Sequence, residues 1–390
     1  MKKIAIIGTG NISALHIKGI LKFPERAKIV ALVDIYPEKA AAKKTEFQLT
    51  EAQVFASHHD LIASGMSIDV VHNCTPPYVH AEISIDCMNA GFHVVVEKPM
   101  ATCLQECDDM IAASEKNQVL LAVIAQNRFQ DSVHKLKVLA ESGIAGKIRV
   151  AHVDSLWWRG KNYYDLWWRG LWEKEGGGPT LNHAVHHIDM INWIQKSLPK
   201  EVTSVLANVM HENSEVEDLS FGILQYHDGS VAQVTSSVVH HGEEQGIVLQ
   251  CEKAKIAAPF DVKSEYAKGN GFPEENTALI ADIKKAYADL ENLAYHGHLG
   301  QIDDILTALE TGKETLITGV DGRKTIELIS AIYKSGLQKK TVTLPLEKTD
   351  DFYTFEGILK HTIKFYEKTT HIENFSADQI SIGRYERDAT

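Results

Sequence analysis

Cysteine, long apolar runs and basic clusters are all scarce in this sequence, and each shortage excludes a class of protein. The 390 residues include only five cysteines, an odd number that is unlike the disulfide framework of a small secreted domain and favours a reducing cytoplasm. No stretch approaches the roughly 18 consecutive apolar residues of a membrane-spanning helix. Lysine and arginine form no block, and 40 basic against 52 acidic residues give a formal net charge of −12, so nucleic acid and anionic membranes are not expected partners.

The length and the apolar content predict two folded domains with an appendage. At roughly 150 residues per domain, the chain has room for about two and a half. Hydrophobic residues make up 44% and charged residues 24%, which is ordinary for globular proteins and supplies enough apolar material for sizeable cores. We expect an N-terminal domain over residues 1–128, a second domain over 129–345 and a C-terminal extension over 346–390.

The first part of the chain alternates short apolar runs with helical segments. The runs lie at residues 2–7, 29–33, 68–74, 93–97 and 120–125. Such alternation is typical of an α/β domain in which a parallel sheet is covered by helices on both faces. From about residue 148, longer stretches of alternating apolar and polar residues predict an antiparallel or mixed sheet. Helices are expected from just after the turn at Gly176–Pro179 to about Gln195, near 299–311 and 321–336, and over 355–366.

Gly8, Gly10 and Ser13 form a G-x-G-x-x-S pattern between the first predicted strand and the first predicted helix. Gly8 permits a tight turn, Gly10 lets the backbone approach a pyrophosphate, and the helix N-terminus offers free amide groups to its charge. On its own, the pattern also fits an ordinary turn. Asp34 follows the second strand, 26 positions after Gly8, where a carboxylate accepts hydrogen bonds from the ribose hydroxyls of adenosine. The glycine pattern and Asp34 together predict dinucleotide binding. They favour NAD over NADP, because a carboxylate repels a 2′-phosphate. The alternative is that Asp34 caps the following turn.

Four more motifs follow this turn in a distinctive order. They are CTPP at 74–77 with His80, EKP at 97–99, GGGPTLNHAVHHID at 176–189 and DGRK at 321–324. With GTGNIS at 8–13, they make the sequence resemble the Gfo/Idh/MocA family, which includes glucose–fructose oxidoreductase and inositol dehydrogenases, over most of residues 1–345. The resemblance implies a Rossmann domain, then a domain built on an open, mainly antiparallel sheet, with nicotinamide-dependent redox chemistry on sugars or polyols between them.

The resemblance also implies which residues contact the cofactor. They are Gly8, Thr9, Gly10, Asn11, Ile12, Asp34, Thr75, Pro76, His80, Glu97, Lys98 and Asn127. Lys98 is implied to be the active-site lysine, which hydrogen-bonds the hydroxyl or carbonyl group that changes oxidation state, with Pro99 fixing the bend after it. From the residues alone, Lys98 ends a strand at the carboxyl edge of the sheet, where open α/β proteins bind ligands. A surface lysine beside a helix-starting proline is the alternative.

Asn182 and His186 are four residues apart on the helix predicted after the glycine run, so both side chains are expected on one helical face. The resemblance implies a pair that is commonly Asp and His, in which His186 takes the hydroxyl proton, a role that suits a group titrating near neutral pH. Asn182 replaces the common Asp and is expected to orient the substrate. A metal cluster of His183, His186, His187 and Asp189 is not expected, because a helix turns by about 100° per residue and the two adjacent histidines diverge.

Two further segments are candidates for the substrate site. AQNRF at 125–129 follows a strand at the domain junction and offers Asn127 and Arg128, with an interdomain salt bridge as the alternative for Arg128. Residues 156–172 hold five of the six tryptophans; aromatic faces beside Arg and Asn suit a sugar ring, and an oligomer interface is the alternative. The expected substrate contacts are Lys98, Arg128, Arg169, Trp172, Asn182, His183 and His186.

Taken together, these features predict an NAD-dependent oxidoreductase that transfers a hydride between nicotinamide and a hydroxyl of a sugar, sugar acid or cyclic polyol, with Lys98, Asn182 and His186 as catalytic residues. Two alternatives stay open: a glycosidase or epimerase that retains its NAD, and a non-catalytic regulatory protein that senses the dinucleotide. Lys98 together with His186 argues against the sensor, because a sensor needs no proton-transfer groups. Besides a small carbohydrate or polyol, the expected partner is another copy of the chain, in a dimer or tetramer formed through the open sheet.

Overall fold

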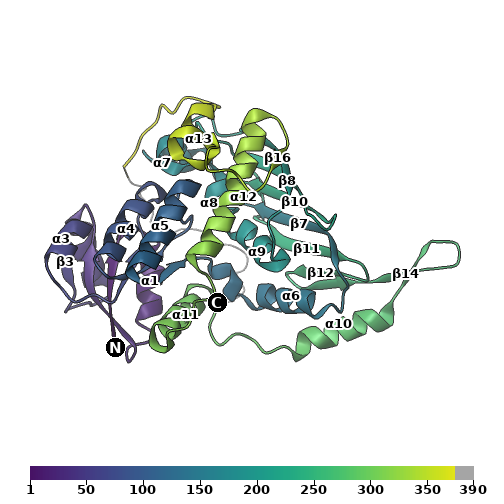
Figure 1. The fold of residues 1–390 in the computed structure, drawn as a ribbon, viewed down its shortest axis with the longest axis horizontal. Coiled ribbons are helices and arrows are strands. Elements are labelled where there is room, and N and C mark those ends of the chain that lie inside the picture. Colours follow the sequence, from purple (N-terminus) through teal and green to yellow (C-terminus); the bar gives the residue numbers. More distant parts are fainter. Residues whose placement is uncertain (374–390) are drawn as a thin grey trace.

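The computed structural model describes residues 1–373, and its N-terminal part is built on a parallel sheet of six strands (Figure 1). The strands are β1 (Lys2–Ile7), β2 (Ala27–Val33), β3 (Gln53–Phe55), β4 (Val70–Asn73), β5 (His93–Val96) and β6 (Leu121–Val123). They lie in the order β3-β2-β1-β4-β5-β6, and every neighbouring pair is parallel. The predicted parallel sheet is confirmed. The order reverses between β1 and β4, which is the place where open α/β sheets bind ligands.

Helices cover both faces of this sheet. They are α1 (Ser13–Ile20), α2 (Pro37–Glu46), α3 (His58–Ala63), α4 (His80–Asn89) and α5 (Leu104–Asn117). A further helix, α11 (Gly297–Thr311), comes from far along the chain and packs against α1. Ile302 and Leu306 of α11 join Ile17 and Ile20 of α1 in one apolar cluster. The core of the first sheet is therefore completed by a segment that the sequence assigned to the second domain.

The second part of the chain forms a mixed sheet of eight strands in the order β13-β12-β11-β7-β10-β9-β8-β16. The strands are β7 (Ile148–Leu156), β8 (Glu201–Ala207), β9 (Leu219–Gln225), β10 (Val231–Ser237), β11 (Gln245–Cys251), β12 (Lys255–Ala258), β13 (Asp261–Lys263) and β16 (Val342–Thr343). Strands β7 and β10 pair in parallel, and the other neighbours pair antiparallel. The mainly antiparallel second sheet is thus confirmed.

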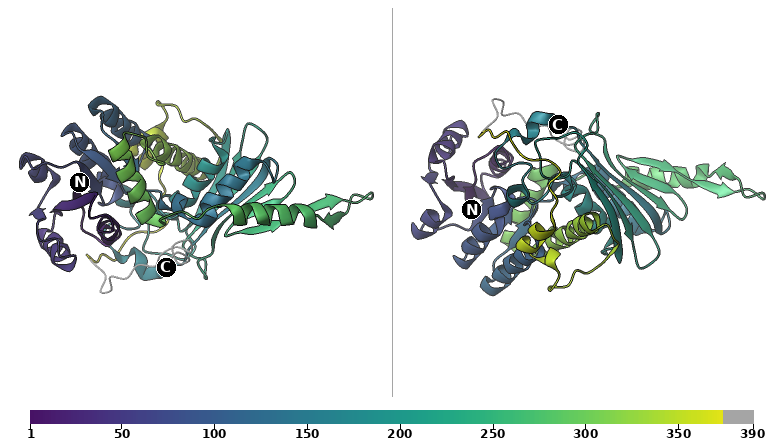
Figure 2. Two further views of the ribbon diagram at one scale, coloured as in Figure 1. Left: turned by 90° about the horizontal axis from the view of Figure 1, so that it is seen from below. Right: turned by 90° about the horizontal axis from the view of Figure 1, so that it is seen from above.

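Helices pack on the face of this sheet that is turned toward the first domain (Figure 2). They are α6 (Asp131–Ser142), α8 (Pro179–Asn182), α9 (Val185–Gln195) and α12 (Gly319–Gln338). The start of α12 is fixed by a capping box, in which Thr318 and Asp321 each bind the other's backbone N–H. Within residues 1–373, no helix is long and apolar enough to cross a membrane.

An arm extends away from the body of the molecule (Figures 1 and 2). It consists of α10 (Thr277–Asp289) and a hairpin of β14 (Glu265–Ala267) and β15 (Pro273–Glu275). The sequence did not predict the hairpin, because its strands are short and fully exposed and show no apolar alternation. The remaining elements are α7 (Trp172–Glu175) and the short 3-10 helices at Pro77–Val79, Gln126–Phe129, Lys161–Asp165 and Asp351–Tyr353.

The C-terminal extension returns to the tryptophan-rich segment. Helix α13 (Phe355–His361) ends earlier than the predicted helix over 355–366, and the chain then continues without regular structure. Its far end pairs with the body of the protein, where Ile372 forms a β-bridge with Leu166. Residues 374–390 of the expected extension lie outside the described residues.

Candidate active site at the carboxyl edge of the parallel sheet

The turn between β1 and α1 contains two glycines with different surroundings. Gly8 has a φ of +87°, and a Cβ there would lie 2.7 Å from the carbonyl oxygen of Cys74, so only glycine fits. Around Gly10, by contrast, no heavy atom of the described residues comes within 4 Å of a Cβ. The turn lies at the switch point between β1 and β4 and leaves the backbone open at Gly10, which fits a bound pyrophosphate.

Asp34 stands beside this turn, directly after β2. Its Oδ2 accepts hydrogen bonds from the backbone N–H of Thr9 at 2.8 Å and from the Thr9 hydroxyl at 2.7 Å. Its Oδ1 accepts one from the N–H of Tyr36 at 3.0 Å. The carboxylate therefore caps the following turn, as the alternative reading held, and also lies against the glycine turn, where it fits the ribose of a dinucleotide.

His80 ties together two loops at the same edge of the sheet. One ring nitrogen is hydrogen-bonded to the Thr75 carbonyl oxygen at 2.7 Å and the other to the Pro99 carbonyl oxygen at 2.8 Å. Burial lowers the pKa of His80. Both ring nitrogens are engaged with backbone, so the His80 ring holds the loops of Thr75 and Pro99 together.

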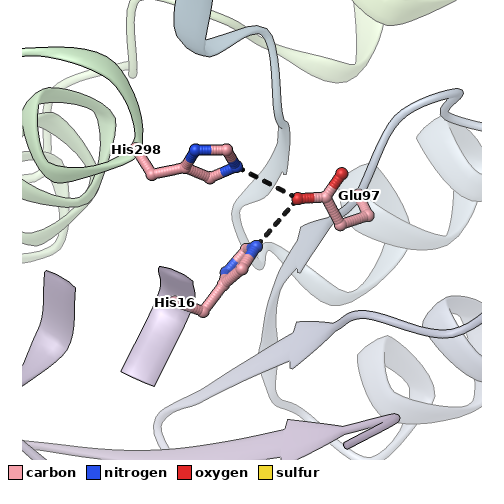
Figure 3. A group of neighbouring side chains, drawn as sticks. All are labelled: His16, Glu97 and His298. Atoms are coloured by element: carbon pink, nitrogen blue, oxygen red, sulfur yellow. Dashed lines mark hydrogen bonds and ion pairs between the residues drawn. The ribbon is translucent and has the colours of Figure 1, made fainter. Parts of the chain in front are cut away.

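Glu97 lies at the centre of a buried network of histidines (Figure 3). Its Oε1 is hydrogen-bonded to His16 at 2.9 Å and to His298 at 3.4 Å, and its Oε2 accepts from the backbone N–H of Lys98 at 3.0 Å. His16 is in turn hydrogen-bonded to His72 at 2.8 Å. Burial raises the pKa of Glu97, but the hydrogen bonds from His16 and His298 outweigh it and hold that pKa well below its usual range.

Two groups in this network come from distant segments, since His16 lies on α1 and His298 on α11. The ligand atoms of His16, Glu97 and His298 lie within 4.8 Å of one another, so the same three residues have the composition of a metal-ligand set. Their separations are also those of ordinary hydrogen bonds. In this arrangement the network fixes the carboxylate immediately before Lys98.

Lys98 reaches across to the second domain. It follows β5, the Lys98–Pro99 bond is cis, and its Nζ donates a hydrogen bond to the backbone carbonyl of Asn182 at 3.0 Å. The lysine expected at the active site is thus held beside the segment expected to supply the other catalytic groups. Lys98 and His186 line a small cavity of about 10 Å³, which is room for about one water and far too little for a sugar.

The prediction of a single helix from Pro179 to about Gln195 is wrong. The structure has two helices, α8 ending at Asn182 and α9 beginning at Val185. The Asn182 side chain turns back and donates to the carbonyl oxygens of Gly177 at 2.9 Å and Gly178 at 3.3 Å. An Asn side chain that binds nearby backbone competes with continued helix, which accounts for the break. Asn182 and His186 consequently do not share one helical face, although both stay near Lys98.

Two imidazoles of this segment, those of His183 and His186, are held neutral. Burial lowers the pKa of His186 well below its ordinary value, and the positive charge of Lys98 lowers it further. Burial does the same to His183, whose pKa is also lowered by the charges of Arg159, Lys98 and Arg169. A neutral imidazole has a nitrogen lone pair that accepts a proton, which is what a general base requires.

Around His183, the tryptophan-rich segment supplies aromatic rings and two arginines. The ring centroids of Trp157 and Tyr163 lie 5.5 and 5.9 Å from that of His183. The Arg169 guanidinium stacks on Tyr163 at 4.2 Å, and Arg159 lies 5.6 Å from the same ring. Arg159 was not predicted from the sequence. The signal was present, because LWWRG occurs at 156–160 and again at 166–170 and each copy supplies one arginine.

Arg128 and Trp172 were both expected to face the substrate, but both are buried against other protein groups. The Arg128 side chain is 2% exposed, and its Nε and Nη2 donate to both carboxylate oxygens of Asp189 at 2.8 and 2.7 Å, which is the salt bridge that the sequence left as the alternative. Trp172 is 2% exposed, packs edge-on against Tyr333, and donates its Nε1–H to the carbonyl of Ile363 at 3.0 Å. Both groups are enclosed by protein, so we leave them out of the substrate site.

Two adjacent regions of the chain match known family models. Residues 2–125 match an oxidoreductase family with an NAD-binding Rossmann fold, and residues 133–257 match the GFO/IDH/MocA C-terminal domain. The chain belongs to the Gfo/Idh/MocA family. Its first domain is therefore an NAD-binding Rossmann domain, which agrees with the bare glycine turn and the position of Asp34.

Several proteins are similar to this Gfo/Idh/MocA chain. It is 25% identical to the myo-inositol 2-dehydrogenase of Thermotoga maritima over 347 residues, 88% of this chain and 98% of that protein. It is 28% identical to the 2,7-anhydro-N-acetylneuraminate hydratase of Mediterraneibacter gnavus over 256 residues, 65% of this chain and 66% of that protein. Its structure resembles that of the WlbA dehydrogenase from Bordetella pertussis in complex with NADH and UDP-GlcNAcA, with a TM-score of 0.77, 27% identity and coverage of 89% of this chain and 98% of that one.

Proposed function

We propose that this oxidoreductase is an NAD-dependent dehydrogenase acting on a hydroxyl group of a sugar, a sugar acid or a cyclic polyol. The observation that carries the proposal is the contact of Lys98, which follows β5, with the segment that supplies Asn182 and His186. This contact lies at the carboxyl edge of the NAD-binding sheet, where such folds bind ligands. A relative named for inositol and a structural neighbour solved with NADH and UDP-GlcNAcA support a carbohydrate or polyol substrate.

Each of the three residues has a distinct role in this proposal. Lys98 places a positive charge beside the reacting oxygen and stabilises the negative charge that develops there as the hydroxyl loses its proton. His186, neutral because burial and Lys98 lower its pKa, accepts that proton. Asn182 is anchored by the carbonyls of Gly177 and Gly178 and orients the substrate. NAD, when bound, supplies the hydride acceptor for oxidation.

The proposal is tested by following NADH absorbance while the purified protein is given NAD and a panel of sugars, sugar acids and inositols. We expect net NADH formation with at least one member, and its loss in the variant Lys98→Met. If no member of the panel yields NADH from a folded protein that binds NAD, the dehydrogenase proposal fails.

A second candidate function has one observation in its favour. The relative from Mediterraneibacter gnavus is named a hydratase. A chain that retains NAD and uses it transiently would convert its substrate with no net change in NADH. Product analysis by mass spectrometry, with cofactor content measured before and after turnover, separates this candidate from the dehydrogenase.

We also propose that the chain assembles through the open face of its second sheet. Phe221 and Ile223 on β9 and Val205 on β8 are exposed there, and Val205 lies directly opposite Phe221. Such an apolar sheet face is typical of an interaction surface, and an isologous dimer buries it against itself.

All five cysteines lie in the described part of the chain and are free, which supports the cytoplasmic location that we propose.

A further inference from the structure

We infer that the substrate carries a carboxylate, and that Arg159 and Arg169 hold it. The inference rests on the proposed function, because it names the chemical class of the hydroxyl compound that the enzyme oxidises. It adds Arg159 to the site beside the predicted Arg169, and it names the anionic group that the two arginines recognise. Its basis is the arrangement of the two guanidinium groups around Tyr163, next to His183 and Lys98.

Each of the two arginines is anchored through one of its nitrogen atoms, Nη1. Nη1 of Arg159 donates to the Trp158 carbonyl and to Glu243, and Nη1 of Arg169 donates to the Tyr163 hydroxyl and to Glu175. Among the described residues, no hydrogen bond uses Nε or Nη2 of Arg169, and the only further hydrogen bond of Arg159 is with the neighbouring Tyr163 side chain. These two nitrogens form the edge of a guanidinium that binds both oxygens of a carboxylate.

Arg169 in particular has a donor that needs an acceptor. Its Nε is shielded from water and has no hydrogen-bond partner in the described part of the chain. A buried donor left unpaired is unfavourable, and buried donors in folded proteins are nearly always paired. A ligand carboxylate would satisfy this atom, whereas a neutral hydroxyl would satisfy it without using the charge.

The surroundings of the two arginines keep the site positive. After burial, the largest influences on the pKa of His183 are the positive charges of Arg159, Lys98 and Arg169. Glu175 and Glu243 each pair with one arginine through its Nη1 atom alone, and Lys98 adds a third positive charge to this region. His183 thus lies in a region where an anion is favoured.

The position of the pair fits a sugar acid whose reacting hydroxyl faces Lys98. The Tyr163 ring contacts both guanidinium groups on one side of the site and lies 5.9 Å from His183, the residue after Asn182. The Asn182 carbonyl in turn receives the Lys98 ammonium. A carboxylate on one carbon of a sugar ring and a hydroxyl on another provide the two ends that such a site would hold. A neutral polyol provides only the hydroxyl.

The test compares substrates that differ only in this group. Glucose and glucuronate, and galactose and galacturonate, are given to the wild type and to Arg159→Gln and Arg169→Gln, with NADH formation as the readout. The wild type should prefer a sugar acid over its neutral counterpart by tenfold or more in kcat/KM. Each substitution should reduce that preference by about 10- to 100-fold, since a charge-assisted hydrogen bond contributes about 1.5 to 3 kcal/mol.

Three controls make the result decisive. Arg149→Gln removes an arginine that is exposed on β7 and paired with Glu252, and should leave the preference unchanged. Arg159→Lys and Arg169→Lys keep the charge but lose the paired donors, so they should lose most of the preference and still fold. Inorganic phosphate as an inhibitor tests the other class of anion, and inhibition stronger than that by glucuronate would overturn the carboxylate assignment.

Calorimetric binding of glucuronate and glucose to the NAD-loaded protein separates failure of this inference from failure of the proposed function. Tighter binding of glucuronate that is lost in Arg159→Gln supports the anion site even if no sugar is oxidised. Oxidation of neutral sugars with equal or better efficiency, or equal losses on both sugars of a pair in the arginine variants, overturns the inference and leaves the dehydrogenase proposal standing.

Discussion

The Lys98 ammonium group donates a hydrogen bond to the backbone carbonyl of Asn182 at 3.0 Å. One residue follows the fifth strand of the Rossmann sheet and the other ends a short helix of the second domain, 84 positions later. The contact therefore exists only when the two domains are packed together. In the proposed mechanism, the reacting group of a substrate lies at this junction and each domain supplies part of the chemistry.

Replacing Lys98 by Met should nearly abolish turnover, because it removes the positive charge at the reacting oxygen while keeping most of the side-chain volume. Binding of NAD, measured by fluorescence titration, should persist. Lys116→Met, on the exposed side of α5, is the matched control and should behave as the wild type. A folded, NAD-bound Lys98→Met protein with wild-type rates would contradict the mechanism.

The pH dependence of oxidation should reflect the low pKa of His186. A general base acts in its deprotonated form, and burial and Lys98 both lower this pKa from its ordinary value of 6.5. The acidic limb of kcat/KM should therefore lie below pH 6.5, and activity should persist as the pH falls through that value. His186→Ala should remove this limb and cost about 100-fold or more. An acidic limb above pH 7 that survives in His186→Ala would assign the base to another group.

Asp34→Ala should weaken NAD binding by about 1 to 3 kcal/mol, if two charge-assisted hydrogen bonds to the ribose are lost. The unmodified protein should prefer NAD, since its carboxylate repels a 2′-phosphate. Titration with both cofactors measures this preference directly. Equal or tighter binding of NADP by the wild type would show that Asp34 serves mainly as the cap of the Tyr36 turn.

The buried pair of Arg128 and Asp189 should matter for stability rather than for substrate binding. Arg128→Met leaves the Asp189 carboxylate buried and unpaired, which typically costs about 3 to 5 kcal/mol. Urea unfolding should show this loss, and the double variant Arg128→Met with Asp189→Leu should recover part of it. The exposed pair of Arg149 and Glu252 is the comparison, and Arg149→Met should change stability little. A raised KM with unchanged stability in Arg128→Met would return Arg128 to the substrate site.

Phe221→Asp should separate the subunits of the proposed assembly, because it places a charge on the exposed face of the second sheet. Light scattering should report a lower mass than for the wild type. Tyr266→Asp, on the projecting hairpin, is a control for any exposed aromatic residue and should leave the mass unchanged. A wild type that is monomeric at high concentration would reject the interface.

Local patterns in the sequence were enough for the NAD-binding half of the protein. Buried strands of a parallel sheet are continuous apolar runs, so β1, β2, β4, β5 and β6 were visible, and the glycine turn and Asp34 sit at fixed offsets from them. The exception was β3, whose three partly exposed residues form no such run. The family motifs then supplied Lys98, Asn182 and His186, whose roles stay predictions.

What the sequence could not supply depended on contacts between distant segments. Helical spacing predicted one helix through Asn182 and His186, but the Asn182 side chain binds the preceding glycine carbonyls and ends α8 there. Arg128 looked equally suited to a substrate and to a salt bridge until α9 brought Asp189 within 2.7 Å of it.

The local sequence thus determined the buried strands of the first sheet and the cofactor turn, because backbone preferences and apolar periodicity act over a few residues. The tertiary structure alone decided which charged side chains are already paired. His16, Glu97 and His298 meet only because α1, β5 and α11 converge, and Arg159 joins Arg169 only because both pack against Tyr163. Whether a buried charge is satisfied within the protein or awaits a ligand depends on partners that are far apart along the chain, and sequence spacing carries no information about them.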